Sequence, residues 1–213
     1  MNPTERHECG ADSVLIMLPG ALMTPQHMMA AGLFAEVKHR ALALDLIAPD
    51  LHAEGADNQR ALRTLETDWL APARARYQRV WLGGISRGGQ LALSCLAGQQ
   101  GEMHGLCLLA PYAGGRITTN AIRRAGGLSA WQAEAAQQAD PDVRLWQWLK
   151  EPLPSVPMFM GYGAQDRFAD GMQMLAEQLP DATHLTVPGE HDWAAWLPLW
   201  RRFLDLDHFP TLP

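Results

Sequence analysis

The chain alternates short apolar runs with longer amphipathic stretches, and each apolar run ends at Gly, Pro or Asp. Several runs are continuously apolar, as expected for strands that are covered on both faces of a sheet. This rhythm predicts an α/β protein with a mostly parallel sheet of about six strands. The predicted strands are Val14–Leu18, Ala41–Ile47, Val80–Ile85, Leu106–Leu109, Met158–Gly161 and His184–Val187.

Helical spacing of apolar positions fills the gaps between these strands and predicts helices on both faces of the sheet. Pro198 lies in the last helical stretch and is expected to start, kink or split it, because proline lacks a backbone N–H. The predicted helices are Pro25–His39, Asn58–Tyr77, Gly88–Ala97, Asp170–Gln178 and one within Trp193–Leu206.

Residues 112–156 break this rhythm, because they form a long connection between two predicted strands. The segment is Gly-rich at first and then carries Trp131, Trp146 and Trp148. Long connections in compact domains usually have a functional role. We therefore expect a helical insertion that forms a lid or a pocket wall.

The composition is acidic, with 17 Lys+Arg against 23 Asp+Glu and a formal net charge of −6. A length of 213 residues suits one domain. Nucleic-acid binding is not expected, because it requires clustered basic residues. No apolar run reaches the roughly 18 residues of a membrane span and the amino-terminal residues are polar, which predicts a cytoplasmic protein. The scattered cysteines, Cys9, Cys95 and Cys107, fit reduced thiols.

The clearest chemical signal is the segment LGGISRGG at residues 82–89, which contains G-x-S-x-G centred on Ser86. The motif falls between a predicted strand and a predicted helix. In a nucleophile elbow, the serine occupies a strained strand-to-helix turn, and the glycines let strand and helix approach closely. A nucleotide-binding turn would instead require G-x-G-x-x-G or G-x-x-x-x-G-K-[ST], and neither is present. The motif therefore predicts that Ser86 is a nucleophile.

Through this motif the chain resembles the α/β-hydrolase superfamily over residues 13–206. That family orders its catalytic residues as Ser, then Asp or Glu after a late strand, then His after the last strand. Here Asp166 follows the strand predicted at 158–161, and His191 follows the strand predicted at 184–187. The resemblance implies a single α/β-hydrolase domain over 1–213 with 112–156 as its insertion. The segment before Val14 is too short for the two strands that commonly come first in relatives, so we expect the sheet to lack them.

The resemblance implies a chemical role for each of these residues. Ser86 would be the nucleophile, His191 the general base and later the acid, and Asp166 the group that orients the imidazole. Glu190 and Asp192 flank the histidine, but adjacent side chains on a tight loop point apart. Asp166 is therefore the predicted third member.

An oxyanion hole needs two backbone N–H donors. The family takes one from the residue after the nucleophile, here Arg87, and one from the loop after an early strand. Alignment of that loop nominates the N–H of Ala21, with that of Leu22 as the neighbouring option. Two departures from the family pattern are Pro19, where relatives often carry His, and the charged side chain of Arg87, which could pair with an acidic neighbour or an acidic substrate.

The predicted activity is hydrolysis of a carboxylic ester with a small apolar acyl group, through an acyl-enzyme intermediate. Candidate residues for the substrate pocket are Leu22, Met23, Trp131 and Trp193. No organic cofactor is expected. No metal is expected either, because the histidines form no H-E-x-x-H motif and the cysteines form no C-x-x-C motif.

Two alternatives stay open at this point. The first is a thioesterase that acts on acyl-coenzyme A or on an acyl carrier protein, whose acidic surface could meet a basic rim formed by Arg116, Arg123 and Arg124. The second is a hydrolase-like binding protein without catalysis. The presence of Ser, Asp and His in the family order weighs against the second.

Overall fold

A computed structural model describes residues 4–51, 58–98 and 102–212 of the chain. Its centre is a seven-stranded sheet of order β1-β3-β2-β4-β5-β6-β7, in which every neighbouring pair is parallel except β1 and β3. The chain continues from β2 to β3 on one side of β2 and returns to β4 on the other. The ends of β2 and β4 therefore flank a crevice, the usual binding position in such sheets. The strands are β1 (Thr4–His7), β2 (Ser13–Leu18), β3 (Asp45–Pro49), β4 (Arg79–Ile85), β5 (Gly105–Leu109), β6 (Met158–Gly163) and β7 (Thr183–Val187).

The predicted α/β fold with a mostly parallel sheet is confirmed, with two corrections. The sheet has seven strands, because the polar segment β1 adds an antiparallel edge next to β3, pairing Thr4 with Pro49 and His7 with Leu46. One strand therefore does precede Val14. The strand expected at Ala41–Ile47 begins only at Asp45, because Ala41 takes a positive φ of 48° in the turn before it.

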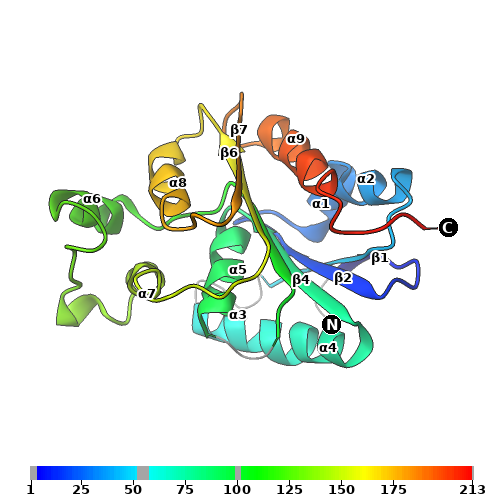
Figure 1. Cartoon of the computed structure of the whole chain (residues 1–213), viewed down its shortest axis with the longest axis horizontal. Helices are drawn as coiled ribbons and strands as arrows, with labels where there is room; N and C mark the ends of the chain where they lie inside the picture. The colour runs from blue at the N-terminus through cyan, green and yellow to red at the C-terminus, as the bar shows by residue number, and fades with distance from the viewer. Residues whose placement is uncertain (1–3, 52–57, 99–101, 213) are drawn as a thin grey trace.

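Helices cover both faces of the sheet, as predicted (Figure 1). Helices α1, α2 and α9 lie on one face, and α3, α4, α5 and α8 lie on the other. Their bounds are α1 (Pro25–Ala30), α2 (Leu33–His39), α3 (Asn58–Thr64), α4 (Ala71–Arg76), α5 (Arg87–Gly98), α8 (Ala169–Ala176) and α9 (Trp193–Leu204).

Two predicted helices are not uniform. The helix expected at Pro25–His39 is divided into α1 and α2 at Gly32, whose φ of 98° no α-helix accepts. The stretch from Asn58 is α-helical in α3 and α4 but π-helical between them, at η2 (Leu65–Leu70). Pro198 lies inside α9 and neither starts nor splits it.

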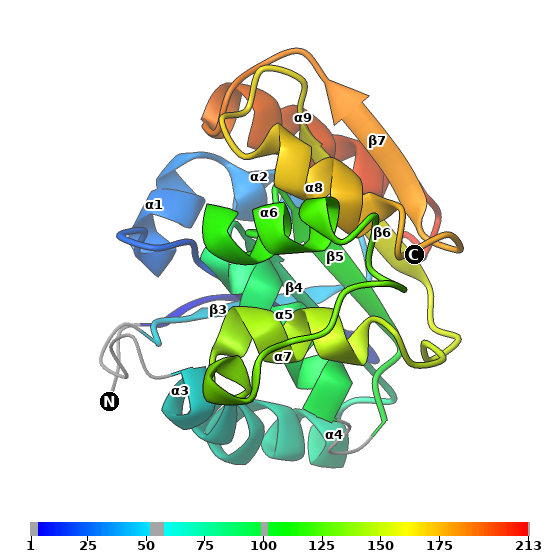
Figure 2. The same cartoon turned by 90° about the vertical axis from the view of Figure 1, so that its left-hand side faces the viewer.

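The connection from β5 to β6 holds two helices, α6 (Arg116–Arg124) and α7 (Pro141–Trp148), and a short 3₁₀ turn, η3 (Ala135–Gln137). Figure 2 shows α6 and α7 in front of α5 and the sheet. Trp146 of α7 holds this segment together, because its side chain is fully buried and donates its indole N–H to the carbonyl oxygen of Ala113 at 2.7 Å. The expectation that this segment is an insertion that forms a lid or a pocket wall stays a prediction.

Asp45, at the start of β3, is an anchor inside the fold. Its fully buried carboxylate accepts hydrogen bonds from the backbone N–H of Cys9 and Ala11 at 2.8 and 3.2 Å, and from the Tyr77 hydroxyl at 2.9 Å. Burial alone would raise the pKa of Asp45, but these hydrogen bonds outweigh it and hold the pKa below the usual value. Burial, followed by the bond to this carboxylate, raises the pKa of Tyr77 to about 12.

The carboxyl-terminal helix α9 is fastened across the same face as α2. The fully buried Trp200 donates its indole N–H to the Leu33 carbonyl oxygen at 3.0 Å, and its ring stacks on Phe203. This packing holds the carboxyl-terminal half of α9 against α2. In the part of the chain described here, no helix combines the length and apolar character needed to cross a membrane.

Candidate active site

Ser86 lies at the turn from β4 into α5 with a φ of 54°, a left-handed conformation that is unusual for a residue with a side chain. Its N–H donates to the carbonyl oxygen of Leu109 at 2.9 Å. A Cβ atom at Gly84 would come within 2.2 Å of Gly88, and one at Gly88 within 2.3 Å of the Leu18 carbonyl oxygen. Both glycines of G-x-S-x-G are therefore required by the close approach of strand and helix.

The side chains of Ser86, His191 and Asp166 form one hydrogen-bonded series. Nε2 of His191 lies 2.9 Å from Oγ of Ser86, and its Nδ1 lies 2.5 Å from Oδ2 of Asp166. An ionised carboxylate can only accept, so Nδ1 carries the proton and Nε2 is free to accept from the serine hydroxyl. The sequence placed these residues on three separate loops, and the fold brings them together.

The loops that carry Asp166 and His191 hold each other in place. The Gln165 N–H donates to the Gly189 carbonyl oxygen at 3.0 Å, and the Gly189 N–H donates to the Gln165 side-chain oxygen at 2.7 Å. The other carboxylate oxygen of Asp166, Oδ1, accepts from the Phe168 N–H at 2.8 Å. With no exposed side-chain area, the Asp166 carboxylate is fixed in both position and rotation.

Two aromatic rings hold the imidazole of His191 from the sides. Phe168 and Trp196 both meet it edge to face, with centroid distances of 5.0 and 5.1 Å. The pocket candidates taken from the sequence included neither of these residues and named Trp193, whose ring instead packs on Trp196 at 5.2 Å. The only available signals were that Phe168 comes two residues after Asp166 and that Trp196 lies one turn into the helix after the histidine.

The loop after β2 passes directly against Ser86, since a Cβ built on Gly20 would lie 3.4 Å from the Ser86 Cβ. In the described part of the chain, the N–H groups of Ala21 and Leu22 have no hydrogen-bond acceptor, and Leu22 has a φ of 60°. Arg87 is the first residue of α5, where backbone N–H groups point out of the helix end. The three nominated donors thus lie on the two segments that flank Ser86.

A cavity of about 210 Å³ opens between these two segments. Its walls are mostly apolar and include Leu22, Leu51, Ala61 and Leu91, together with Arg87. The Arg87 guanidinium donates to the side-chain oxygen of Asn58 at 2.9 Å. Pockets for drug-sized ligands usually measure about 300–1,000 Å³, so this cavity suits a small group.

The remaining pocket candidates lie outside the lining of this cavity. Met23 is buried, and its N–H closes the turn by donating to the Gly20 carbonyl oxygen at 3.2 Å. Trp131 is buried within the insertion, and its carbonyl oxygen accepts a hydrogen bond from the Lys150 ammonium. Leu22 lines the cavity while remaining 93% exposed.

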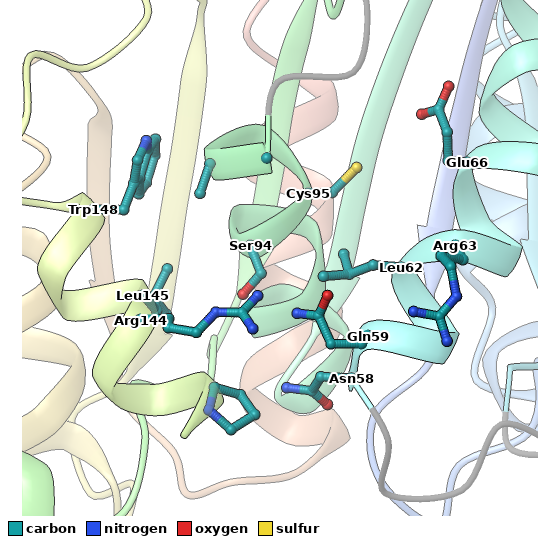
Figure 3. Close-up of a pocket in the computed structure, with 13 residues that line it drawn as sticks. Asn58, Gln59, Leu62, Arg63, Glu66, Ser94, Cys95, Arg144, Leu145 and Trp148 are labelled. Carbon is teal, nitrogen blue, oxygen red and sulfur yellow. The ribbon is translucent and has the colours of Figure 1, made fainter. Parts of the chain in front are cut away.

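A separate groove of about 380 Å³ runs along α5 between α3 and α7 (Figure 3). Gln59 and Arg144 extend toward one another across it, and neither Ser86 nor His191 lines it. It contains Cys95, where burial, reinforced by the nearby Glu66, raises the pKa of the thiol to about 12. The Cys95 thiol therefore stays protonated at neutral pH, and a protonated thiol is a poor nucleophile.

Among the residues described, no group of three or more His, Cys, Asp and Glu side chains is arranged to hold a metal ion.

The fold is shared with many solved structures. The fluorophosphonate-binding serine hydrolase FphF of Staphylococcus aureus is similar with a TM-score of 0.65, 15% identity and coverage of 90% of this chain and 82% of its own. S-formylglutathione hydrolase FrmB of Staphylococcus aureus is similar with a TM-score of 0.61, 16% identity and coverage of 90% and 79%. Mouse alpha/beta hydrolase domain-containing protein 10 gives a TM-score of 0.63, 16% identity and coverage of 95% and 92%.

These likenesses show that the chain has the α/β-hydrolase fold, as its resemblance to that superfamily predicted. A scan against protein-family models and a search of curated proteins each gave no match. At this low identity, the likeness concerns the fold, and function must be argued from the site.

Proposed function

We propose that the protein is a serine hydrolase that cleaves a carboxylic ester through an acyl-enzyme intermediate. The observation that carries this proposal is the hydrogen-bonded series from Ser86 through His191 to Asp166, with the serine on a strained strand-to-helix turn. The series has the partners and the order that nucleophilic catalysis by serine requires.

In this mechanism, Oγ of Ser86 attacks the ester carbonyl carbon while Nε2 of His191 takes the hydroxyl proton. The carbonyl oxygen becomes an oxyanion, which the N–H groups of Arg87 and of Ala21 or Leu22 would stabilise. Breakage of the carbon–oxygen bond releases the alcohol, which receives the proton from His191. Water then attacks the acyl group with the same proton transfers, releases the acid and regenerates Ser86.

A small apolar acyl group is the proposed acyl half of the substrate. The cavity of about 210 Å³ beside Ser86 supports this choice, because its walls are mostly apolar and its size is limited. Leu22 belongs to this wall, so the proposal keeps it as a pocket residue. Trp131 and Trp193 are better regarded as packing residues, the first inside the insertion and the second behind Trp196.

A thioesterase is the second candidate, because the same acyl-enzyme chemistry releases a thiol as readily as an alcohol. One of the similar structures, FrmB, is an S-formylglutathione hydrolase, and S-formylglutathione is a thioester. Short and long 4-nitrophenyl esters and acyl-coenzyme A should therefore be assayed in parallel. Turnover of thioesters alone would replace the ester proposal with the thioesterase.

Labelling with a fluorophosphonate probe tests the nucleophile directly. The wild-type protein should be labelled at one serine, and Ser86→Ala should lose at least 95% of the labelling if Ser86 is the reactive residue. Ser94→Ala is the matched control, because Ser94 lies on the same helix α5 but faces the separate groove. Unlabelled wild-type protein would refute the hydrolase and favour a binding protein.

A further inference from the structure

A second cavity near the proposed site is lined by arginines. It measures about 310 Å³ and lies between α6 and the loop after β6. Arg116 and Arg123 enter it from α6, and their spacing of seven residues puts them on one face of that helix. Arg167, which directly follows Asp166 in the chain, completes the lining with a third guanidinium.

Phe168 is the wall that this cavity shares with the proposed catalytic residues. The ring lines the cavity and also meets the imidazole of His191 edge to face. Its other aromatic neighbour is Tyr112, at a centroid distance of 5.5 Å, and the Tyr112 N–H donates to the Ser86 carbonyl oxygen at 2.9 Å. The cavity is therefore separated from the proposed catalytic histidine by the thickness of one side chain, so a substrate that reacts at Ser86 could reach it.

The local charge is opposite to that of the whole chain, whose formal net charge is −6. Asp170 is the one acidic residue in the cavity lining, and its exposed carboxylate lies 3.6 Å from the Arg123 guanidinium. Over the described residues, Arg116 and Arg167 form no ion pair. The Arg167 guanidinium instead lies over the Phe168 ring, 4.8 Å from its centroid. Three cations against one carboxylate leave the cavity with a net positive charge.

We propose that this cavity binds a carboxylate group of the substrate, so that the preferred esters or thioesters carry an anionic end away from the scissile carbonyl. The inference rests on the proposed hydrolase function and specifies its substrate class. Arginine suits the role because its planar guanidinium can donate two parallel hydrogen bonds to a carboxylate. A cavity of about 310 Å³ is at the lower end of the range for small-molecule pockets, which favours a small anionic substrate over the surface of a carrier protein.

The test compares matched anionic and neutral esters. One pair carries the charge on the acyl side, mono-4-nitrophenyl adipate against 4-nitrophenyl hexanoate, and the other on the leaving group, 4-acetoxybenzoate against 4-methylphenyl acetate. In one of the two pairs, kcat/KM of wild type should favour the anionic ester at least tenfold. Arg116→Gln and Arg123→Gln should each lower that ratio about fivefold or more, and added salt should lower it in wild type.

Arg124→Gln is the matched control, because it removes the same charge from the same helix at a position outside the cavity lining. Its ratio should stay within twofold of wild type. A wild-type preference for the neutral ester in both pairs would overturn the proposal. It would also be overturned if Arg124→Gln lowered the ratio of kcat/KM values as much as Arg123→Gln does. Failure of the hydrolase function itself looks different, since wild type would then hydrolyse none of the four esters and take up no fluorophosphonate.

Discussion

Replacing Asp166 by Asn tests how the carboxylate determines which ring nitrogen of His191 carries the proton. Oδ1 of Asp166 accepts from the Phe168 N–H, and Oδ2 accepts from Nδ1 of His191. An Asn side chain has one acceptor oxygen, and the Phe168 N–H requires it. The amide NH₂ must then face Nδ1, which turns Nδ1 into an acceptor and puts the ring proton on Nε2. In that tautomer, Nε2 donates to Ser86 and cannot take its proton.

We expect a large loss of kcat in Asp166→Asn, because the buried Asn side chain cannot rotate without leaving the Phe168 N–H unpaired. In a Ser-His-Asp arrangement, the wrong imidazole tautomer lowers kcat about 10,000-fold. This corresponds to about 5 kcal/mol of transition-state stabilisation. The assay is kcat and KM for a short 4-nitrophenyl ester, together with the rate of fluorophosphonate labelling. Both rates should fall in Asp166→Asn, while the circular dichroism spectrum stays that of wild type.

Glu190→Gln is the control, because Glu190 also lies next to His191 in the chain but has an exposed side chain. We expect its kcat to stay within about threefold of wild type, since exposed charges contribute little. The reasoning would be refuted if folded Asp166→Asn kept more than a tenth of the wild-type kcat. If kcat fell further in Glu190→Gln than in Asp166→Asn, the orienting carboxylate would be Glu190 and our assignment of Asp166 would be wrong.

Two further predictions concern the fold around the site. Gly88→Ala places a methyl group 2.3 Å from the Leu18 carbonyl oxygen; we expect a loss of about 3 kcal/mol in the free energy of unfolding and a fall in Tm of roughly 6–12 °C. Gly98 lies in the same helix but has open space around it, so the free energy of unfolding of Gly98→Ala should stay within about 1 kcal/mol of the wild-type value. Equal Tm values for the two variants would contradict the packing argument. The lowered pKa of Asp45 means that its ionised form stabilises the fold above the unfolded pKa of about 4 and that this contribution is lost as pH falls through the lower folded value. In urea unfolding, Asp45→Asn should therefore be less stable than wild type at pH 7, with a smaller difference at pH 3, and a difference that does not change with pH would show that the charge contributes nothing.

The central strands could be predicted because their signal is local. After their first residues, Ser13 and Arg79, β2 and β4 are continuously buried apolar runs, as is the whole of β5, and burial on both faces leaves few other solutions. β1 could not be found in this way, because Thr4–His7 is polar and becomes a strand only through its pairing with β3. The division at Gly32 was visible in principle, since glycine is the residue that readily adopts its positive φ.

The proposed catalytic residues were predictable for a different reason. The turn at Ser86 constrains its glycines sterically, and strand order brings the loops after β6 and β7 to the same edge of the sheet. The rings around His191 had no comparable signal, because Phe168 and Trp196 are ordinary apolar residues until the loops fold. The arginine cavity was also only partly visible, since Arg167 joins Arg116 and Arg123 through the tertiary fold alone.

The distance along the chain between the reacting groups has a consequence for biosynthesis. Ser86 and His191 lie 105 residues apart, and the loop that carries His191 is held by α9, which ends at Leu204. Contacts of such long sequence separation form late in folding, after the intervening chain has been synthesised and ordered. While residues up to the elbow are emerging from the ribosome, the serine has neither its base nor its orienting carboxylate. The hydrolase that we propose is therefore inert until the chain has been synthesised through α9 and this helix has docked.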